Sequence, residues 1–306
     1  MRRVGLRAVG VAWVVVSATA AAWLLVHLLR PGLFAGEDGV LPVRLWRFLD
    51  RAFLHFDFGS STSGSRRPVA TLIREGLPAD VSLLAGGLVL GLALGAGGAL
   101  LCARRPRGLI SRALQAGAMV GVCAPVYVMG LLALLFLGAD IGVLPLGAGI
   151  PLEYVPFSES PARWLGALVV PWLVLGLPLA GMCLRVMLGE MVEIADEDYV
   201  RAARAKGLPE RVVRRRHVAL PALGPTAMVA SAAMPLLLTN AVLVEQVFSV
   251  PGVFRDLTRS IGQANYPLIF GMTAVGALLI ALTTMLFDLF LHWLDPRIRG
   301  GTTQEV

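Results

Sequence analysis

The amino-acid sequence predicts an all-α integral membrane protein with six transmembrane helices, and three observations carry this prediction. The chain of 306 residues is 57% hydrophobic and 15% charged, which is not the composition of an ordinary water-soluble domain. Six apolar runs are each long enough to cross the roughly 30 Å hydrocarbon layer of a bilayer, which takes about 20 helical residues. Arginine gathers in the short connections between these runs, as is typical of cytoplasmic loops in membrane proteins.

The six expected spans define the organisation of the chain. They are approximately 9–29, 81–102, 113–137, 164–188, 226–247 and 268–291. We therefore expect four segments: an N-terminal tail with the first span (1–29), an extracytoplasmic segment (30–80), a five-helix transmembrane core (81–293) that includes a cytoplasmic loop (189–223), and a cytoplasmic tail (294–306). A cleaved signal peptide is the alternative for the first span, because arginines precede it and small residues follow. Its apolar stretch is longer than a signal peptide needs, which favours an uncleaved anchor.

The charges of the short connections predict the orientation of the chain. The second connection carries four arginines within 104–112, whereas the third, 138–163, carries three acidic residues and one arginine. Because basic loops stay in the cytoplasm, both termini are expected there, and 30–80, 138–163 and 248–267 are expected to face outward. The segment 30–80 is expected to be partly helical and to lie on the membrane surface. The net charge of +7 is explained by this anchoring, so we expect no nucleic-acid partner.

Catalytic and metal-binding patterns are missing from the sequence. It has no G-x-x-x-x-G-K-[ST] phosphate loop, no H-E-x-x-H zinc motif and no G-x-S-x-G nucleophile elbow. Its three cysteines and four histidines are scattered, so no metal-ligand spacing is present. The ionisable residues near membrane depth, Asp80, Arg185, Asp288 and His292, fall at the ends of the expected spans, which argues against a proton relay. We expect no catalytic residue, no metal site and no cofactor bound by this chain.

The most informative segment is the fourth connection, 196–217. Acidic residues at 196–198 are expected to cap a helix start and to complement its charge, Lys206 suits its last turn, and Gly207 supplies a left-handed stop, which together predict a two-turn helix. A second helix is expected to begin at 208–210, with proline in its first turn, and to return the chain to the membrane.

One face of the two-turn helix combines an aromatic residue with small ones. Tyr199, Ala202, Ala203 and Lys206 fall at i, i+3, i+4 and i+7, so another protein could approach this backbone closely. The alternative is a solvated basic loop held by anionic lipid, which the arginine run 214–216 fits equally well.

At this point the residues resemble a known family. The run EDYVRAARAKGL (197–208), with His217 ten residues after Gly207, resembles the cytoplasmic loop of dipeptide, oligopeptide and nickel ABC importer permeases. Further motifs agree in order along nearly the whole chain: RPG (30–32), FDFGSS (56–61), GLPADVSLL (76–84), APVYVMGLL (124–132), GVLPLG (142–147), VEQVFSVPGV (244–253), NYPLIFG (265–271) and DPRIR (295–299). Each motif alone is weak, but their joint order and spacing are specific.

The resemblance implies a type I ABC importer permease fold in the bacterial inner membrane. Such a chain forms half of a translocation pathway and pairs with a second homologous permease subunit, two cytoplasmic ABC ATPase subunits or domains, and an extracytoplasmic solute-binding protein. The partners use ATP and magnesium, and the permease itself is not catalytic. The loop helix of such permeases inserts into the ATPase, so the resemblance implies a coupling site at Tyr199, Ala202, Ala203, Lys206 and Gly207.

A gate is expected at the outward end of the fifth span. Pro251 and Gly252 interrupt helical pairing there, and non-helical backbone at membrane depth must be buried in protein or line a cavity. We therefore expect Glu245, Phe248, Pro251 and Gly252 to face the pathway or the partner permease, with Phe248 sealing the passage. The alternative is a plain interfacial turn with a carboxylate that reaches the headgroups.

The substrate stays open, and two other function classes lack the sequence features that they require. Arg201, where the wider superfamily often has glutamate, favours the peptide branch, with nickel chelates, glutathione or haem-like ligands as alternatives. A secondary transporter would need inverted repeats, and an intramembrane enzyme would need convergent polar groups; the sequence shows neither. Two departures from the family, Leu220-Pro221 in place of Arg-Asn and a short outer segment after Gly32, leave the re-entry contacts and the docking of the binding protein open.

Overall fold

The computed structural model describes residues 2–30, 39–62, 66–137 and 153–294, and this part of the chain is helical without any β-strand. One isolated antiparallel bridge joins Ser60 and Pro68. The all-α prediction is therefore confirmed for the described residues. The motifs expected at 142–147 and 295–299, and the predicted tail after 294, lie outside them.

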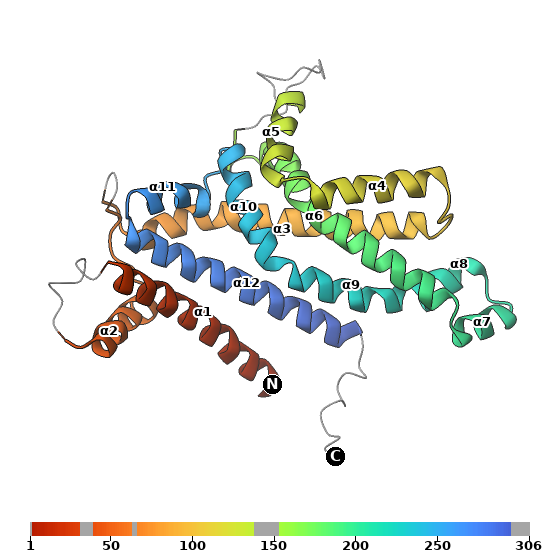
Figure 1. Ribbon diagram of the computed structural model, residues 1–306, viewed down its shortest axis with the longest axis horizontal. Coiled ribbons are helices and arrows are strands. Elements are labelled where there is room, and N and C mark those ends of the chain that lie inside the picture. Colours follow the sequence, from red (N-terminus) through yellow and green to blue (C-terminus); the bar gives the residue numbers. More distant parts are fainter. Residues whose placement is uncertain (1, 31–38, 63–65, 138–152, 295–306) are drawn as a thin grey trace. The chain divides into compact units, whose positions relative to one another are not determined.

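Four of the predicted spans are single continuous helices, which Figure 1 shows in sequence colours. They are α1 (Arg2–Leu29), α3 (Val69–Cys102), α6 (Pro161–Ala195) and α12 (Tyr266–Leu294). Each is long and apolar enough to cross a membrane. The start of α6 follows ordinary capping rules, because the Ser160 side chain accepts a hydrogen bond from the Arg163 N–H and Pro161 takes the first helical position.

The other two predicted spans are bent pairs of helices. In the first, α4 (Leu109–Cys123) and α5 (Val126–Leu137) meet at 114°. Ala124 between them is extended because it precedes Pro125, and proline disfavours the helical conformation of the residue before it. In the second, α9 (Leu220–Ala232) and α10 (Met234–Val247) belong to a pair that bends by 52° beside Pro235. Six spans result if each bent pair is one span.

One compact unit comprises residues 1–82 and 249–285. Besides α1 and parts of α3 and α12, it holds α2 (Leu41–Leu54), a short 3-10 turn (Phe254–Asp256) and α11 (Leu257–Gly262). Aromatic residues fix α2 against its neighbours: the ring of Phe48 lies 6.0 Å from Trp23 and 5.2 Å from Phe270, between ring centroids. The expected helix within 30–80 is therefore present, whereas its position on the membrane surface stays a prediction.

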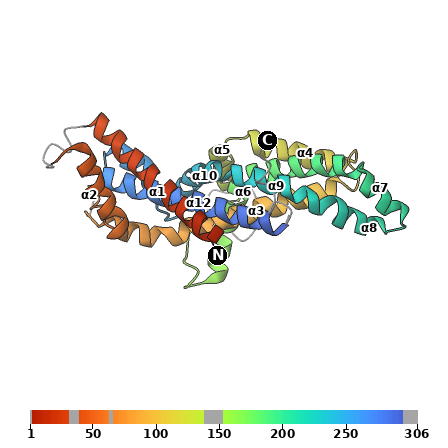
Figure 2. The same ribbon diagram turned by 90° about the horizontal axis from the view of Figure 1, so that it is seen from below.

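The second compact unit comprises residues 83–248 and 286–306, and α6 runs through its core. Glycines let α3 and α4 approach α6 closely. A Cβ on Gly95 of α3 would lie 2.8 Å from the Ala180 carbonyl oxygen, and one on Gly181 of α6 would lie 2.5 Å from the Ala118 oxygen. Such backbone contacts at small residues are the usual packing mode of membrane helices. Figure 2 shows α7 and α8 together at one end of this unit, next to the end of α6.

Candidate functional site

The predicted two-turn helix is present as α7 (Asp198–Ala205), directly after α6. Exposed ion pairs lie at its two ends: Arg201 pairs with Asp198, and Arg204 pairs with Glu210 at 3.3 Å. Arg204 also donates to the Ala195 carbonyl oxygen at 3.1 Å. Glu197 occupies the N-cap position without a side-chain capping hydrogen bond, so the expected acidic cap is wrong in detail. The acidic residues favour this helix start through their charge instead.

Gly207 ends α7 as predicted. Its φ of +77° is left-handed, and its N–H donates to the Arg204 carbonyl oxygen at 2.9 Å. After Gly207 the chain enters α8 (Glu210–Val212), for which Pro209 is the N-cap rather than a first-turn residue. A π-helical segment, η2 (Val213–Ala219), then continues into α9. The bend at Gly207 therefore sets the direction in which the chain returns.

A buried apolar cluster fastens α7 to the rest of its unit. Val200 of α7 is completely buried and Ala203 is 7% exposed. They join a cluster with residues from the ends of α3 and α6 and from η2 and α9: Ala99, Cys102, Met187, Leu188, Met191, Val213, Val218, Ala219 and Ala222. Because protein interiors are close-packed, these contacts attach α7 closely to the ends of the spanning helices α3 and α6.

Tyr199 adds a polar link between α7 and η2. Its hydroxyl donates to the His217 carbonyl oxygen at 2.9 Å. Partial burial, and the nearby Glu197 carboxylate, raise the pKa of Tyr199 above that of an ordinary phenol. Sequence reasoning missed this contact, for which the only available signal is that both residues lie in the same loop.

The structure separates the four residues of the predicted docking face. Tyr199, Ala202 and Lys206 are exposed, whereas Ala203 points into the cluster of its own chain. Ala203 therefore does not lie on the outer surface of α7 with the other three. The helical spacing alone does not tell which of two adjacent alanines faces inward.

The expected gate residues fall into both compact units, and each group is described by itself. In one unit, α10 ends at Val247, Glu245 is completely buried and Phe248 is 4% exposed. A Cβ added to Gly130 of α5 would lie 3.4 Å from the Phe248 ring, so glycine lets α5 pass close to it. Glu245 and Phe248 are thus enclosed by their own chain and not at its surface.

In the other unit, residues 249–253 form a non-helical turn, as predicted. Ser249 has a left-handed φ of +55°, Pro251 is exposed, and the Gly252 N–H donates to the Val250 carbonyl oxygen at 2.9 Å. Whether these residues act as a gate stays a prediction.

Asp80 accepts a hydrogen bond from this turn, and sequence reasoning missed this role of Asp80. Its side chain is completely buried, and the Val253 N–H lies 3.1 and 3.0 Å from its two carboxylate oxygens. A Cβ on Gly76 would lie 2.7 Å from the Val253 nitrogen, so α3 and the turn are in close contact. The expectation that Asp80 lies at a helix end is wrong, because α3 begins at Val69 and Asp80 therefore lies within the helix. The available signal was an acidic residue two positions after Pro78, directly before an apolar run.

In the part of the chain that the structure describes, no three His, Cys, Asp or Glu residues are grouped so that they could hold a metal ion. The features found are, in one unit, the packed ends of α3, α6 and α7 and, in the other, the turn at 249–253 that is hydrogen-bonded to Asp80.

Comparisons with known proteins agree with this geometry. Residues 85–300 match the family described as binding-protein-dependent transport system inner membrane component. The dipeptide transport system permease protein DppB of Lactococcus lactis subsp. cremoris is 30% identical over 243 residues, which cover 79% of this chain and 76% of that protein. The oligopeptide transport system permease protein AppB of Bacillus subtilis is likewise 30% identical, with the same two coverages.

A solved structure shares the fold. A chain in the crystal structure of a bacterial alginate ABC transporter, in complex with a periplasmic protein bound to an alginate pentasaccharide, matches with a TM-score of 0.52. The match covers 91% of this chain and 96% of that chain at 16% identity, which shows the fold alone. Family match, curated relatives and apolar helices together place the chain in the bacterial inner membrane as a multi-pass protein. The chain belongs to the family of binding-protein-dependent transport system inner membrane components.

Proposed function

We propose that this chain is the permease subunit of an ABC importer that takes up peptides by alternating access. The names of the relatives in Lactococcus and Bacillus support peptide as the cargo. Nickel chelates, glutathione and haem-like ligands are the alternatives. A second homologous permease would complete the pathway, and two ABC ATPase subunits or domains would hydrolyse ATP with magnesium, while this chain binds no cofactor. The periplasmic protein of the alginate transporter supports a solute-binding protein here.

The observation that carries the proposal is the attachment of α7. Its inner face is fixed by Val200 and Ala203 to the ends of α3 and α6, while Ala202 and Lys206 stay exposed. A helix held on one side and open on the other is suited to receive a movement from a docked protein. Tyr199, Ala202, Lys206 and Gly207 therefore form the proposed coupling site, and Ala203 serves it by anchoring α7 from the inside.

We also propose a gate at the end of α10 and in the turn that follows it along the chain. Glu245 and Phe248 would be packed closed in the resting state, and Pro251 and Gly252 would supply the non-helical backbone that moves. The hydrogen bond from the Val253 N–H to Asp80 would hold the turn between transport cycles.

Uptake by reconstituted vesicles tests the proposal. The chain, purified with its co-expressed partners, is placed in proteoliposomes with the solute-binding protein outside and ATP inside. We expect uptake of labelled peptide that requires both ATP and the binding protein. Labelled nickel chelate, glutathione and haem are offered under the same conditions, and preference for one of these would replace peptide as the cargo. Uptake driven by an ion gradient without ATP would instead indicate a secondary transporter.

A further inference from the structure

A cavity of about 490 Å³ lies at one end of the second compact unit, where α3, α6, η2 and α9 meet. Three arginines and no acidic residue are among the residues that line it. The apolar part of its wall comes from Leu100 near the end of α3 and from Leu220 and Leu223 of α9. The cavity therefore has one basic and one apolar side, at the point where an apolar spanning helix gives way to an arginine-rich segment.

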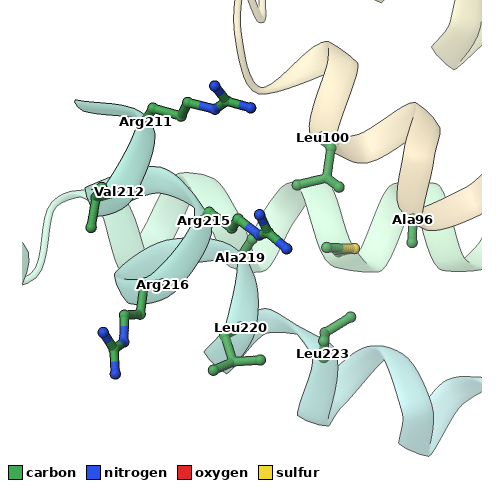
Figure 3. A pocket seen from close by; sticks show the side chains of 10 residues that line it. Ala96, Leu100, Arg211, Val212, Arg215, Arg216, Ala219, Leu220 and Leu223 are labelled. Atoms are coloured by element: carbon green, nitrogen blue, oxygen red, sulfur yellow. The ribbon is translucent and has the colours of Figure 1, made fainter. Parts of the chain in front are cut away.

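The π-helical turn explains why the arginines gather. Arg215 and Arg216 of η2 follow Arg211 of α8 by four and five residues, and Arg215, about one turn after Arg211, extends to the same side of the helix, whereas Arg216 points toward the outer edge (Figure 3). Figure 3 shows the Arg215 side chain reaching toward Leu100, with Arg211 above it and Arg216 toward the outer edge. In the part of the chain that the structure describes, none of the three arginines forms an ion pair.

We infer that this cavity binds an anionic phospholipid of the surrounding membrane. A phosphate would accept paired hydrogen bonds from the Arg211 and Arg215 guanidinium groups, whose planar donors match phosphate oxygens. An acyl chain would cover Leu100 and Leu220, which are 39% and 49% exposed. A free phosphate satisfies only the basic side and a neutral lipid only the apolar side, so the two-sided wall selects a molecule that is both anionic and apolar.

The bound lipid would also bear on the helices that carry α7. Met187 and Ala219 line the cavity and belong to the buried cluster that anchors α7. Occupation of the cavity would therefore brace η2 against α3. The inference rests on the membrane location of the chain and not on its proposed cargo or coupling, so it can fail while peptide transport stands.

Native mass spectrometry of the full-length chain, assembled with the subunits that co-purify, tests the inference. Phosphatidylglycerol is titrated in the presence of excess phosphatidylcholine, and retained lipid is counted. The double variant R211Q/R215Q should weaken phosphatidylglycerol retention about 25-fold, or about fivefold per arginine. The double variant R104Q/R105Q changes the net charge equally at two exposed arginines just after α3 and should leave retention unchanged.

A second variant and two further probes separate the alternatives. Ala96→Phe fills the apolar side without changing any charge, and it should also lower phosphatidylglycerol retention. Equal loss in both double variants would show a general charge effect and overturn the site. Displacement of the lipid by glycerol 3-phosphate at equal concentration would reduce it to an anion site. Lipid retained by the isolated chain but expelled from the assembled complex would assign the cavity to a protein partner instead.

Discussion

Substitutions at Gly207 test how far coupling depends on the bend after α7. The backbone there has a φ of +77°, and a Cβ would meet no atom within 4 Å. Gly207→Ala therefore adds no clash, and its cost is the left-handed strain of about 1–2 kcal/mol. Gly207→Asn should cost less, because asparagine tolerates this conformation. Gly207→Pro cannot adopt a positive φ and also removes the hydrogen bond to the Arg204 carbonyl oxygen, worth about 1 kcal/mol more.

These strain energies should weaken the coupling of ATP hydrolysis to the binding protein, and they should not lower the amount of assembled complex. The bend is local and Gly207 is exposed, whereas the cluster around Val200 that fixes α7 is untouched. A strain of about 1–2 kcal/mol changes the population of the native bend by a factor of about 5 to 30. In proteoliposomes with equal amounts of assembled complex, loaded binding protein should stimulate ATP hydrolysis less in Gly207→Asn than in the unchanged protein, and less again in Gly207→Ala. Gly207→Pro should abolish the stimulation.

A matched control separates backbone strain from the mere addition of a methyl group. Gly189 lies inside α6, and a Cβ there also meets no atom within 4 Å, but its backbone is helical. Gly189→Ala should therefore retain full stimulation, since alanine favours a helix by about 1 kcal/mol over glycine. Normal stimulation in an assembled Gly207→Pro complex would refute the role of the bend, as would equal damage from Gly189→Ala.

Three further predictions concern the gate and the topology. Asp80→Leu should leave the buried Val253 N–H without its carboxylate acceptor, lower the free energy of unfolding by about 1–3 kcal/mol and raise ATP hydrolysis in the absence of substrate. Asp80→Asn keeps one acceptor oxygen, so both of its effects should be smaller. Equal effects of the two variants would show that this hydrogen bond does not hold the turn. Single cysteines at Gly108 and Ser158, in a chain without its native cysteines, should label from opposite sides of the membrane, and outside labelling of both would contradict the six-span topology. A cysteine at Phe248, which is 4% exposed, should react with a soluble reagent only during turnover, and reaction at the same rate without ATP would contradict the gate.

Hydropathy predicted the positions of the spans well, because a membrane-spanning segment must be apolar over a fixed length. It predicted their geometry poorly, because apolar length carries no information about where a helix bends. The bends at Ala124 and beside Pro235 come from backbone restrictions that an apolar average does not register. The second span was expected to begin at 81, yet α3 begins at Val69, because helix continues through polar residues before the apolar run. Asp80 was misplaced as a consequence.

The coupling segment shows the same division between pattern and packing. The acidic start, the length of α7 and the left-handed Gly207 follow from local rules that act within a few residues, so the sequence predicted them. The inward position of Ala203 depends on contacts with α6 and η2, which lie outside the helix itself. The Tyr199 hydrogen bond to His217 likewise joins residues 18 positions apart and required the fold.

Site-specific cross-linking from α7 tests the central claim most directly. A photoreactive residue replaces exposed Ala202, and in a matched chain it replaces Ala203, which is 7% exposed and packs inside. In transporting complexes, the account predicts that position 202 forms an adduct with the ATPase subunit, while position 203 forms adducts only within its own chain. Adducts of position 202 with lipid alone, in a complex that still imports peptide, would contradict the docking of α7 on the ATPase.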